Sequence, residues 1–295
     1  MSTQLQSSDF IFRRLWGYAL ERFPPLAYTV LVVLFAGSAF GLAGHLGDIQ
    51  VPLEIEIRAA IVVLLVFLHL RIMDEHKDAA GDLVAYPQRL LSRGVVTLPL
   101  LAKVGYLAVI IEMVLAFSIS LHAFYAWLAC LVFTLLMKVE FGVGEWLNRH
   151  LVVYAVTHNP IVALLGVFLW VSSGTDWDPL IGLYLLGVSL GSLAFELGRK
   201  IRLPTEEIEG VESYSSVLGL STANRILRRV RVLASACFGV MAWEMGSTGL
   251  VVTIFVAAVL VSISIVFGGL NAKKTEALST VSLLMDFIFV WILVW

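Results

Sequence analysis

Four carboxylates lie close together between residues 74 and 82. Asp74, Asp78 and Asp82 follow one another at intervals of four residues, and Glu75 comes three residues before Asp78. On a helix, residues three and four apart are neighbours, about 5–6 Å apart at Cβ, so these side chains would share one face. Mg²⁺ is usually held by one or two carboxylates together with substrate phosphates. The spacing therefore predicts a metal–diphosphate site with these four side chains as ligands.

Two arginines follow the acidic cluster, within the segment 86–94. The guanidinium groups of Arg89 and Arg93 match the geometry of phosphate oxygens and stay charged at any physiological pH. We expect them to neutralise a leaving diphosphate, and the predicted catalytic residues are Asp74, Asp78, Asp82, Arg89 and Arg93. A solvated turn at a membrane surface is the simpler alternative. It does not explain four acids at helical spacing directly after an apolar segment.

The composition indicates which elements must position this cluster. Of the 295 residues, 59% are hydrophobic and only 14% are charged, and the mean hydropathy is +0.92. An average soluble domain carries roughly 25% charged residues. A soluble chain with so little charge could not cover its own surface, so the sequence predicts a protein that crosses the membrane several times.

A helix needs about 20 mostly apolar residues to cross about 30 Å of hydrocarbon. Nine segments qualify, at 25–46, 55–73, 95–118, 121–139, 151–173, 179–198, 224–245, 248–270 and 276–295. We expect a single all-α domain over residues 1–295, a membrane bundle of about nine helices around a central cavity. The longest polar segments, 74–94 and 199–223, would form a cap over the active site.

The distribution of charge gives an orientation and excludes some functions. With the N-terminus inside, all 20 lysines and arginines except Arg58 and Lys103 fall on one side of the membrane. The positive-inside rule then places the N-terminus in the cytoplasm and the C-terminus outside, as expected for a bacterial-type plasma membrane protein. A net charge of −2 argues against a nucleic-acid partner. Two cysteines in apolar runs indicate no disulfide scaffold.

The acidic cluster resembles the first signature of the UbiA superfamily of intramembrane prenyltransferases, N/D-D-x-x-D-x-x-x-D after the second span. Asp74, Glu75, Asp78 and Asp82 stand at the four signature positions, with glutamate in place of the second aspartate. Arg89 and Arg93-Gly94 are similar to the basic tail that follows. The resemblance implies nine spans, Mg²⁺ as the cofactor, and a prenyl diphosphate as the substrate.

The second polar segment departs from this family's pattern, which has a D-x-x-x-D pair before a glycine and a later Leu-Gly. Aligning Gly210 and Leu218-Gly219 with that pattern places Glu206 at the later aspartate and Arg202 at the earlier one. Two interpretations remain open. Carboxylates could hold a second Mg²⁺, through Glu196, Glu206 and Glu207. Alternatively, basic side chains could bind the diphosphate directly, through Arg199, Lys200 and Arg202. These charges could also serve only to orient the neighbouring spans.

Polar residues inside spans are costly and are functional candidates. His69 lies just before the acidic cluster, and His158 and Asn159 precede a proline that should kink the fifth span; we expect these three to contact substrate. Asp286, deep in the last span, needs a partner, for which Lys103 is a candidate.

The expected function is Mg²⁺-dependent transfer of an isoprenoid group from a prenyl diphosphate to a small acceptor, aromatic or other, with release of diphosphate. A terpene cyclase of the same family, which needs no acceptor, is the nearest alternative. A lipid-binding or transport protein without catalytic activity is a third possibility. The expected partners are the two substrates and membrane lipid, while the prenyl chain length, the acceptor and the oligomeric state stay open.

Overall fold

The regular structure is helical throughout the part of the chain that the computed structural model describes, residues 5–207, 211–267 and 271–294. Its helices are α1 (Ile11–Arg22), α2 (Pro25–Gly47), α3 (Leu53–Ala85), α4 (Leu98–Ile119), α5 (Leu121–Lys138), α6 (Gly144–Asn148), α7 (Leu151–His158), α8 (Pro160–Ser173), α9 (Pro179–Arg199), α10 (Tyr214–Leu218), α11 (Leu220–Glu244), α12 (Thr248–Phe267) and α13 (Ala272–Val294). Short 3₁₀ turns are η2 (Glu140–Gly142) and η3 (Pro204–Glu206). Residues 268–270 and 295, at the predicted ends of two spans, lie outside the described part.

Seven described segments are both long and apolar enough to cross a membrane. They are Pro25–Gly47, Leu98–Ile119, Leu121–Lys138, Leu151–Ser173, Pro179–Arg199, Thr248–Ile265 and Ala272–Val294. The chain is therefore a multi-pass, all-helical membrane bundle. Helices α3 and α11 have the length for a crossing, but each carries charged residues near one or both ends, which shortens its apolar stretch. The predicted number of nine crossings is not confirmed by these criteria.

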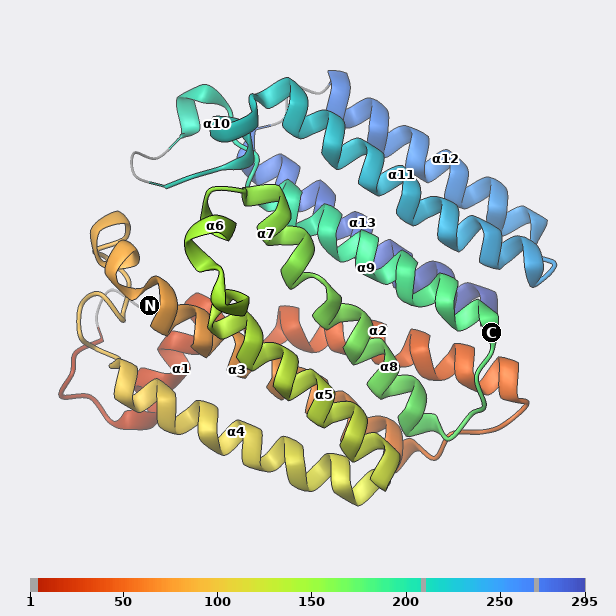
Figure 1. Ribbon diagram of the computed structural model, residues 1–295, viewed down its shortest axis with the longest axis horizontal. Coiled ribbons are helices and arrows are strands. Elements are labelled where there is room, and N and C mark those ends of the chain that lie inside the picture. Colours follow the sequence, from red (N-terminus) through yellow and green to blue (C-terminus); the bar gives the residue numbers. More distant parts are fainter. Residues whose placement is uncertain (1–4, 208–210, 268–270, 295) are drawn as a thin grey trace.

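The long helices lie side by side, and Figure 1 shows α1 and the C-terminal end of α13 at opposite ends of the bundle. Helix α9 packs most extensively against α11 and α13, and α3 packs mainly against α4. Close approach of α9 to α11 depends on Gly187, because a Cβ at this position would lie 2.8 Å from the ring of Phe238. The main core joins α2, α8, α9 and α13 around large buried side chains such as Phe35, Phe168 and Tyr184.

The predicted kink in the fifth span is confirmed. Helix α7 ends at His158 and α8 begins at Pro160, which has no N–H to donate within a helix. The amide of Asn159 donates a hydrogen bond of 2.8 Å to the backbone carbonyl of Ser189 on α9. This side chain therefore fastens the break to the neighbouring helix.

The acidic cluster lies on a continuous helix. Helix α3 does not stop at residue 73, where the predicted span ended, but runs on to Ala85 and carries the cluster beyond the apolar stretch. The short helix α1 lies against this extension, because Arg22 Nε donates a 2.6 Å hydrogen bond to the buried carboxylate of Glu75.

Candidate functional site

A cavity of about 730 Å³ lies where the polar extension of α3 faces the C-terminal end of α9 and the segment that follows it. Residues of 74–82 and, far away in the sequence, residues of 196–202 and 211–213 both contribute to its wall. Its charged lining residues are Arg22, Arg71, Asp74, Lys77, Asp78, Asp82, Arg89, Glu196, Arg199, Lys200, Arg202 and Glu212. Because basic side chains outnumber acidic ones in this set, the cavity favours a polyanion.

Two of the predicted metal ligands are open to the cavity. The side chain of Asp74 is 53% exposed, and its nearest cation is Arg71, at 3.7 Å. Asp78 forms no ion pair with any described residue. Partial removal from water raises the pKa of the Asp78 carboxyl above its ordinary value. These two carboxylates are the side chains of the cluster most accessible to a ligand.

The donor set fits a magnesium–diphosphate complex better than a metal site made by protein alone. The described residues contain no group of three or more His, Cys, Asp or Glu side chains placed to hold a metal ion. Mg²⁺ commonly takes only one or two carboxylates and completes its shell with phosphate oxygens and water. Asp74 and Asp78 can supply that number.

The other two residues of the cluster are engaged with arginines. Asp82 accepts a short hydrogen bond from Arg89 and lies 3.7 Å from Arg22 Nη2. Glu75 is 2% exposed, pairs with Arg22 and does not line this cavity. In this arrangement Asp82 and Glu75 hold Arg22 and Arg89 in place at the rim of the cavity.

At the C-terminal end of α9, the carboxylate of Glu196 holds the side chains of Arg199 and Lys200 in place. Glu196 lies 2.5 Å from Arg199 Nε and 2.9 Å from Lys200 Nζ. Both cations line the cavity opposite the acidic face of α3, and Arg202 joins them there. This geometry favours direct binding of a diphosphate by the basic residues of the second loop.

The two later predicted metal ligands, Glu206 and Glu207, do not line the cavity. Glu206 accepts hydrogen bonds from the backbone N–H groups of Leu203 (3.2 Å) and Ala272 (2.9 Å), so its carboxylate lies at the N-terminus of α13. Glu207 accepts hydrogen bonds of 2.8 Å from the hydroxyls of Ser213 and Ser215. Both carboxylates therefore stabilise the loop. Gly210, used to align the segment, lies outside the described residues.

Three buried nitrogen atoms in the cavity wall have no hydrogen-bond partner among the described residues: Arg71 Nε, Arg202 Nη1 and His158 Nε2. Buried polar groups are nearly always hydrogen-bonded in native proteins. Two of the three belong to the guanidinium groups of residues that line the cavity, although these particular atoms are buried. The positive charge of both groups favours an anion in the cavity.

One side of the cavity is aromatic. The rings of Tyr154 and His158 stack with centroids 4.0 Å apart. Lys77 donates a short hydrogen bond to the Tyr154 hydroxyl and forms a 2.6 Å ion pair with Glu140. Burial lowers the pKa of Lys77, but its hydrogen bonds to Glu140 and Tyr154 outweigh this effect and raise it. Lys77 therefore remains a cation beside the ring of Tyr154, 4.6 Å from the ring centroid.

Several lining residues were not singled out from the sequence. In the sequence, Arg22, Arg71 and Lys77 indicate only charges that orient the spans, and Tyr154 lies within an apolar run. The spacing could have indicated two of these residues. Arg71 precedes Asp74 by three positions and Tyr154 precedes His158 by four, so on a helix each shares a face with a predicted site residue. The position of Arg22 follows only from the packing of α1 on α3.

The remaining predicted site residues do not line this cavity. His69 is buried between α3, α4 and α5, where its Nδ1 lies 2.8 Å from Glu112 Oε1 and its Nε2 lies 3.3 Å from Thr134. The Asn159 amide is used in the helix break. Arg93 donates a hydrogen bond to the Leu5 carbonyl.

Asp286 does not pair with Lys103. Its partner is Arg231 of α11, which donates to both carboxylate oxygens; the Nη1 bond is 2.6 Å. The expectation was wrong because Lys103 is exposed on α4, whereas Arg231 lies on the buried face of α11. The pair joins α11 to α13 in the interior of the bundle.

Comparison with known proteins supports the fold. No family model and no curated protein matches the chain in sequence. Two solved structures, each 16% identical, match over nearly the whole chain. One is an apo structure of a UbiA homolog from Aeropyrum pernix K1, with a TM-score of 0.60, covering 90% of this chain and 96% of that one. The other concerns digeranylgeranylglyceryl phosphate synthase in membranes, with a TM-score of 0.58 and coverages of 91% and 97%. The chain thus has the UbiA fold, in agreement with the resemblance seen in its first motif.

Proposed function

We propose that this protein is a Mg²⁺-dependent intramembrane prenyltransferase, which moves an isoprenoid group from a prenyl diphosphate to a small acceptor and releases diphosphate. One observation carries the proposal: the acidic face of α3 and the basic end of α9 line the same cavity, in a fold shared with UbiA proteins. An intramembrane bundle that brings carboxylates and cations together at one cavity suits a substrate with an anionic head and an apolar tail.

The basic side chains would bind the diphosphate and stabilise it as it leaves. Arg199, Lys200 and Arg202 approach from one side, and Arg71 and Arg89 from the other. Fixed cations that face the developing negative charge favour cleavage of the bond between the prenyl carbon and oxygen. Mg²⁺, held by Asp74 and Asp78, would supply further charge neutralisation. Tyr154 lines the same cavity, with His158 stacked on its ring and the Lys77 ammonium over it.

His158 is the candidate contact for the acceptor. Its Nδ1 lies 2.8 Å from the backbone carbonyl of Tyr154, which can only accept, so Nδ1 carries the hydrogen. The remaining nitrogen, Nε2, carries the lone pair; it is buried and has no hydrogen-bond partner among the described residues, while the residue itself lines the cavity. It can accept a hydrogen bond from a hydroxyl or amine of the acceptor as the new bond forms.

A terpene cyclase would use the same ionisation chemistry without an acceptor, and it differs from the transferase in its product. A transporter usually places charged coupling residues at the midplane, next to broken helices. Here the charge concentrates in a cavity next to the loop segments, and the buried Arg231–Asp286 pair is mutually satisfied. This distribution favours an enzyme.

The test is release of pyrophosphate by the purified protein from farnesyl or geranylgeranyl diphosphate. Release should require Mg²⁺, stop with EDTA and fall at least ten-fold in Asp78→Asn. Asp176→Asn is the matched control, because Asp176 is exposed and does not line the cavity. No release with any acceptor, or equal release by both variants, would contradict the proposal. Release without an acceptor, with a hydrocarbon or terpene alcohol as product, would identify a cyclase.

The proposal also includes the orientation of the chain in the membrane and the cap over the active site. The N-terminus would face the cytoplasm, the C-terminus the outside, and α3 and α11 would cross as the remaining two of nine spans. Segments 74–94 and 199–223 would cover the site from the cytoplasmic side. Single cysteines introduced at Ser7 and Ser247 should then react with an impermeant maleimide from opposite sides of a bacterial plasma membrane.

A further inference from the structure

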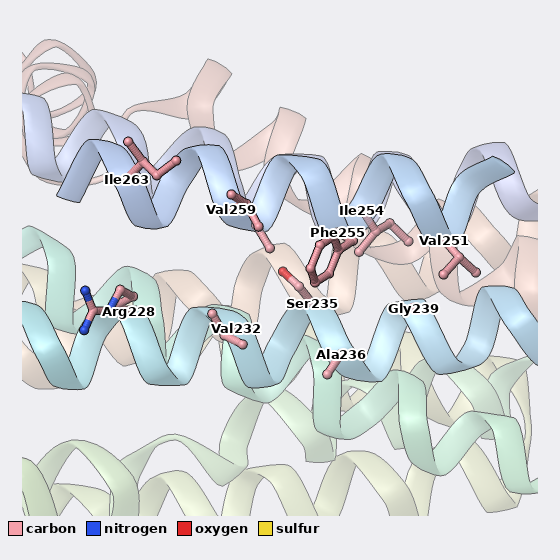
Figure 2. A pocket seen from close by; sticks show the side chains of 11 residues that line it. Arg228, Val232, Ser235, Ala236, Gly239, Val251, Ile254, Phe255, Val259 and Ile263 are labelled. Atoms are coloured by element: carbon pink, nitrogen blue, oxygen red, sulfur yellow. The ribbon is translucent and has the colours of Figure 1, made fainter. Parts of the chain in front are cut away.

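A second cavity lies on the outer surface of the bundle, in a groove between α11 and α12. Its volume is about 520 Å³, and apart from Arg228 and Ser235 its lining residues are apolar or glycine. Figure 2 shows Val232, Phe255 and Val259 along the groove and Arg228 at one end of it. Phe255 is 69% exposed, so this wall faces the surroundings of the protein. The groove shares no lining residue with the charged cavity.

Small residues on α11 keep the groove open. Ala236 and Gly239 line it opposite the larger side chains of α12. A Cβ added at Gly239 would meet no atom within 4 Å, so the space beside this residue is unfilled by the protein. In a membrane, such a space between two apolar helices is filled by a hydrocarbon chain.

The length of the groove matches one leaflet of a bilayer. Its lining runs from Arg228 to Gly239 on α11, which at 1.5 Å per residue is about 16 Å. This is about half of the roughly 30 Å hydrocarbon core. The arginine end adjoins the start of α11, near the segment whose Val211 and Ser213 line the charged cavity.

Positive charge is concentrated at that same end. Arg225, Arg228 and Arg229 lie in the first turns of α11, and none of them forms an ion pair with any described residue. Arg228 is the one of these three that lines the groove. A ligand with an apolar chain about one leaflet long and an anionic head would complement both parts.

We propose that this groove is a binding site for an anionic phospholipid, with one acyl chain between α11 and α12 and its phosphate group against Arg228. The acyl chain contacts Val232, Phe255 and Val259, and the headgroup stays at the membrane surface. Contact between the lipid phosphate and Arg228 should strengthen binding by about five-fold, equivalent to about 1 kcal/mol.

The test uses delipidated protein in detergent, mixed with palmitoyl-oleoyl phosphatidylglycerol or phosphatidylcholine, with bound lipid counted by native mass spectrometry. The wild type should retain more phosphatidylglycerol than phosphatidylcholine. Arg228→Gln should lower this retention about five-fold. Arg229→Gln is the matched control, because Arg229 is exposed and does not line the groove; it should change retention little.

A second pair of variants tests whether the acyl chain binds in the apolar part of the groove. Gly239→Leu should fill the groove and lower retention of both lipids, whereas Gly249→Leu on α12, outside the lining, should not. Equal effects of the two arginine variants, or of the two glycine variants, would overturn the proposal. So would displacement of phosphatidylglycerol by farnesyl diphosphate, which would make the groove a prenyl site. Loss of a dimer in Gly239→Leu would assign it to a second copy.

Discussion

Replacement of Asp286 by alanine should destabilise the bundle more than a typical core substitution. Asp286 is fully buried and accepts two hydrogen bonds from Arg231, which is itself only 5% exposed. Without the carboxylate, the guanidinium keeps only Ser235 Oγ at 3.3 Å and the Ser282 carbonyl at 3.4 Å. Both distances exceed the usual 2.9–3.0 Å. Breaking a buried ion pair from one side costs about 3–5 kcal/mol, and we expect a loss in this range.

The assay is unfolding in mixed micelles with an increasing fraction of sodium dodecyl sulfate, followed by circular dichroism. The double variant Arg231→Met with Asp286→Leu removes both charges and should recover most of the stability lost in Asp286→Ala. The two sites should therefore be strongly coupled in a double-mutant cycle with Arg231→Met and Asp286→Leu as its single variants. A loss below about 1 kcal/mol in the single variant, or additive losses in the double variant, would refute this reasoning.

Three further predictions follow from contacts outside the cavity. Glu75→Gln should loosen α1, seen as faster proteolysis between α1 and α2, while the Mg²⁺ requirement for pyrophosphate release stays unchanged because Glu75 does not line the cavity. Glu112→Gln should cost about 1–3 kcal/mol in the same unfolding assay, because the two carboxylate oxygens face the buried nitrogens His69 Nδ1 and Trp127 Nε1, and the amide offers only one acceptor oxygen. Gly198→Leu should cost about 1–3 kcal/mol because its side chain would overlap Ser279 on α13; Ser279→Ala in the same chain should restore part of this loss, and no restoration would contradict the explanation.

The acidic face of α3 could be predicted because its signal is local. The spacing of Asp74, Asp78 and Asp82 depends only on helix geometry, and the structure places all three in one cavity wall. Which of them remain available to a ligand could not be predicted. That depends on α1 and on the loop after α3, which bring Arg22 and Arg89 to Asp82.

The partner of Asp286 was missed for a different reason. The four arginines at the start of α11 form one dense cluster in the sequence, and the positive-inside rule assigns all four to the cytoplasmic side. The buried residues Ala223, Leu227, Arg231 and Phe238 follow a helical period. Arg231 therefore shares the apolar face, and this register is the signal that separates it from its three neighbours.

The functional assignment of the second loop also required tertiary structure. From the sequence alone, a glutamate next to arginines that binds a metal cannot be distinguished from one that only stabilises the loop. The hydrogen bonds of Glu206 to the start of α13, and of Glu207 to two serines, distinguish these cases. Of the three glutamates predicted as metal ligands in this segment, Glu196, Glu206 and Glu207, only Glu196 lines the cavity.

The Arg231–Asp286 pair also constrains the order in which the protein can be assembled. An arginine near the centre of an isolated helix costs about 2.5–3.5 kcal/mol on insertion into the membrane. Its compensating carboxylate lies on α13, which is synthesised after α11 and α12. Helix α11 therefore cannot reach its final stability until α13 has been synthesised. A ribosome-stalled chain that ends before α13 should hold α11 loosely, accessible to aqueous reagents that the finished protein excludes.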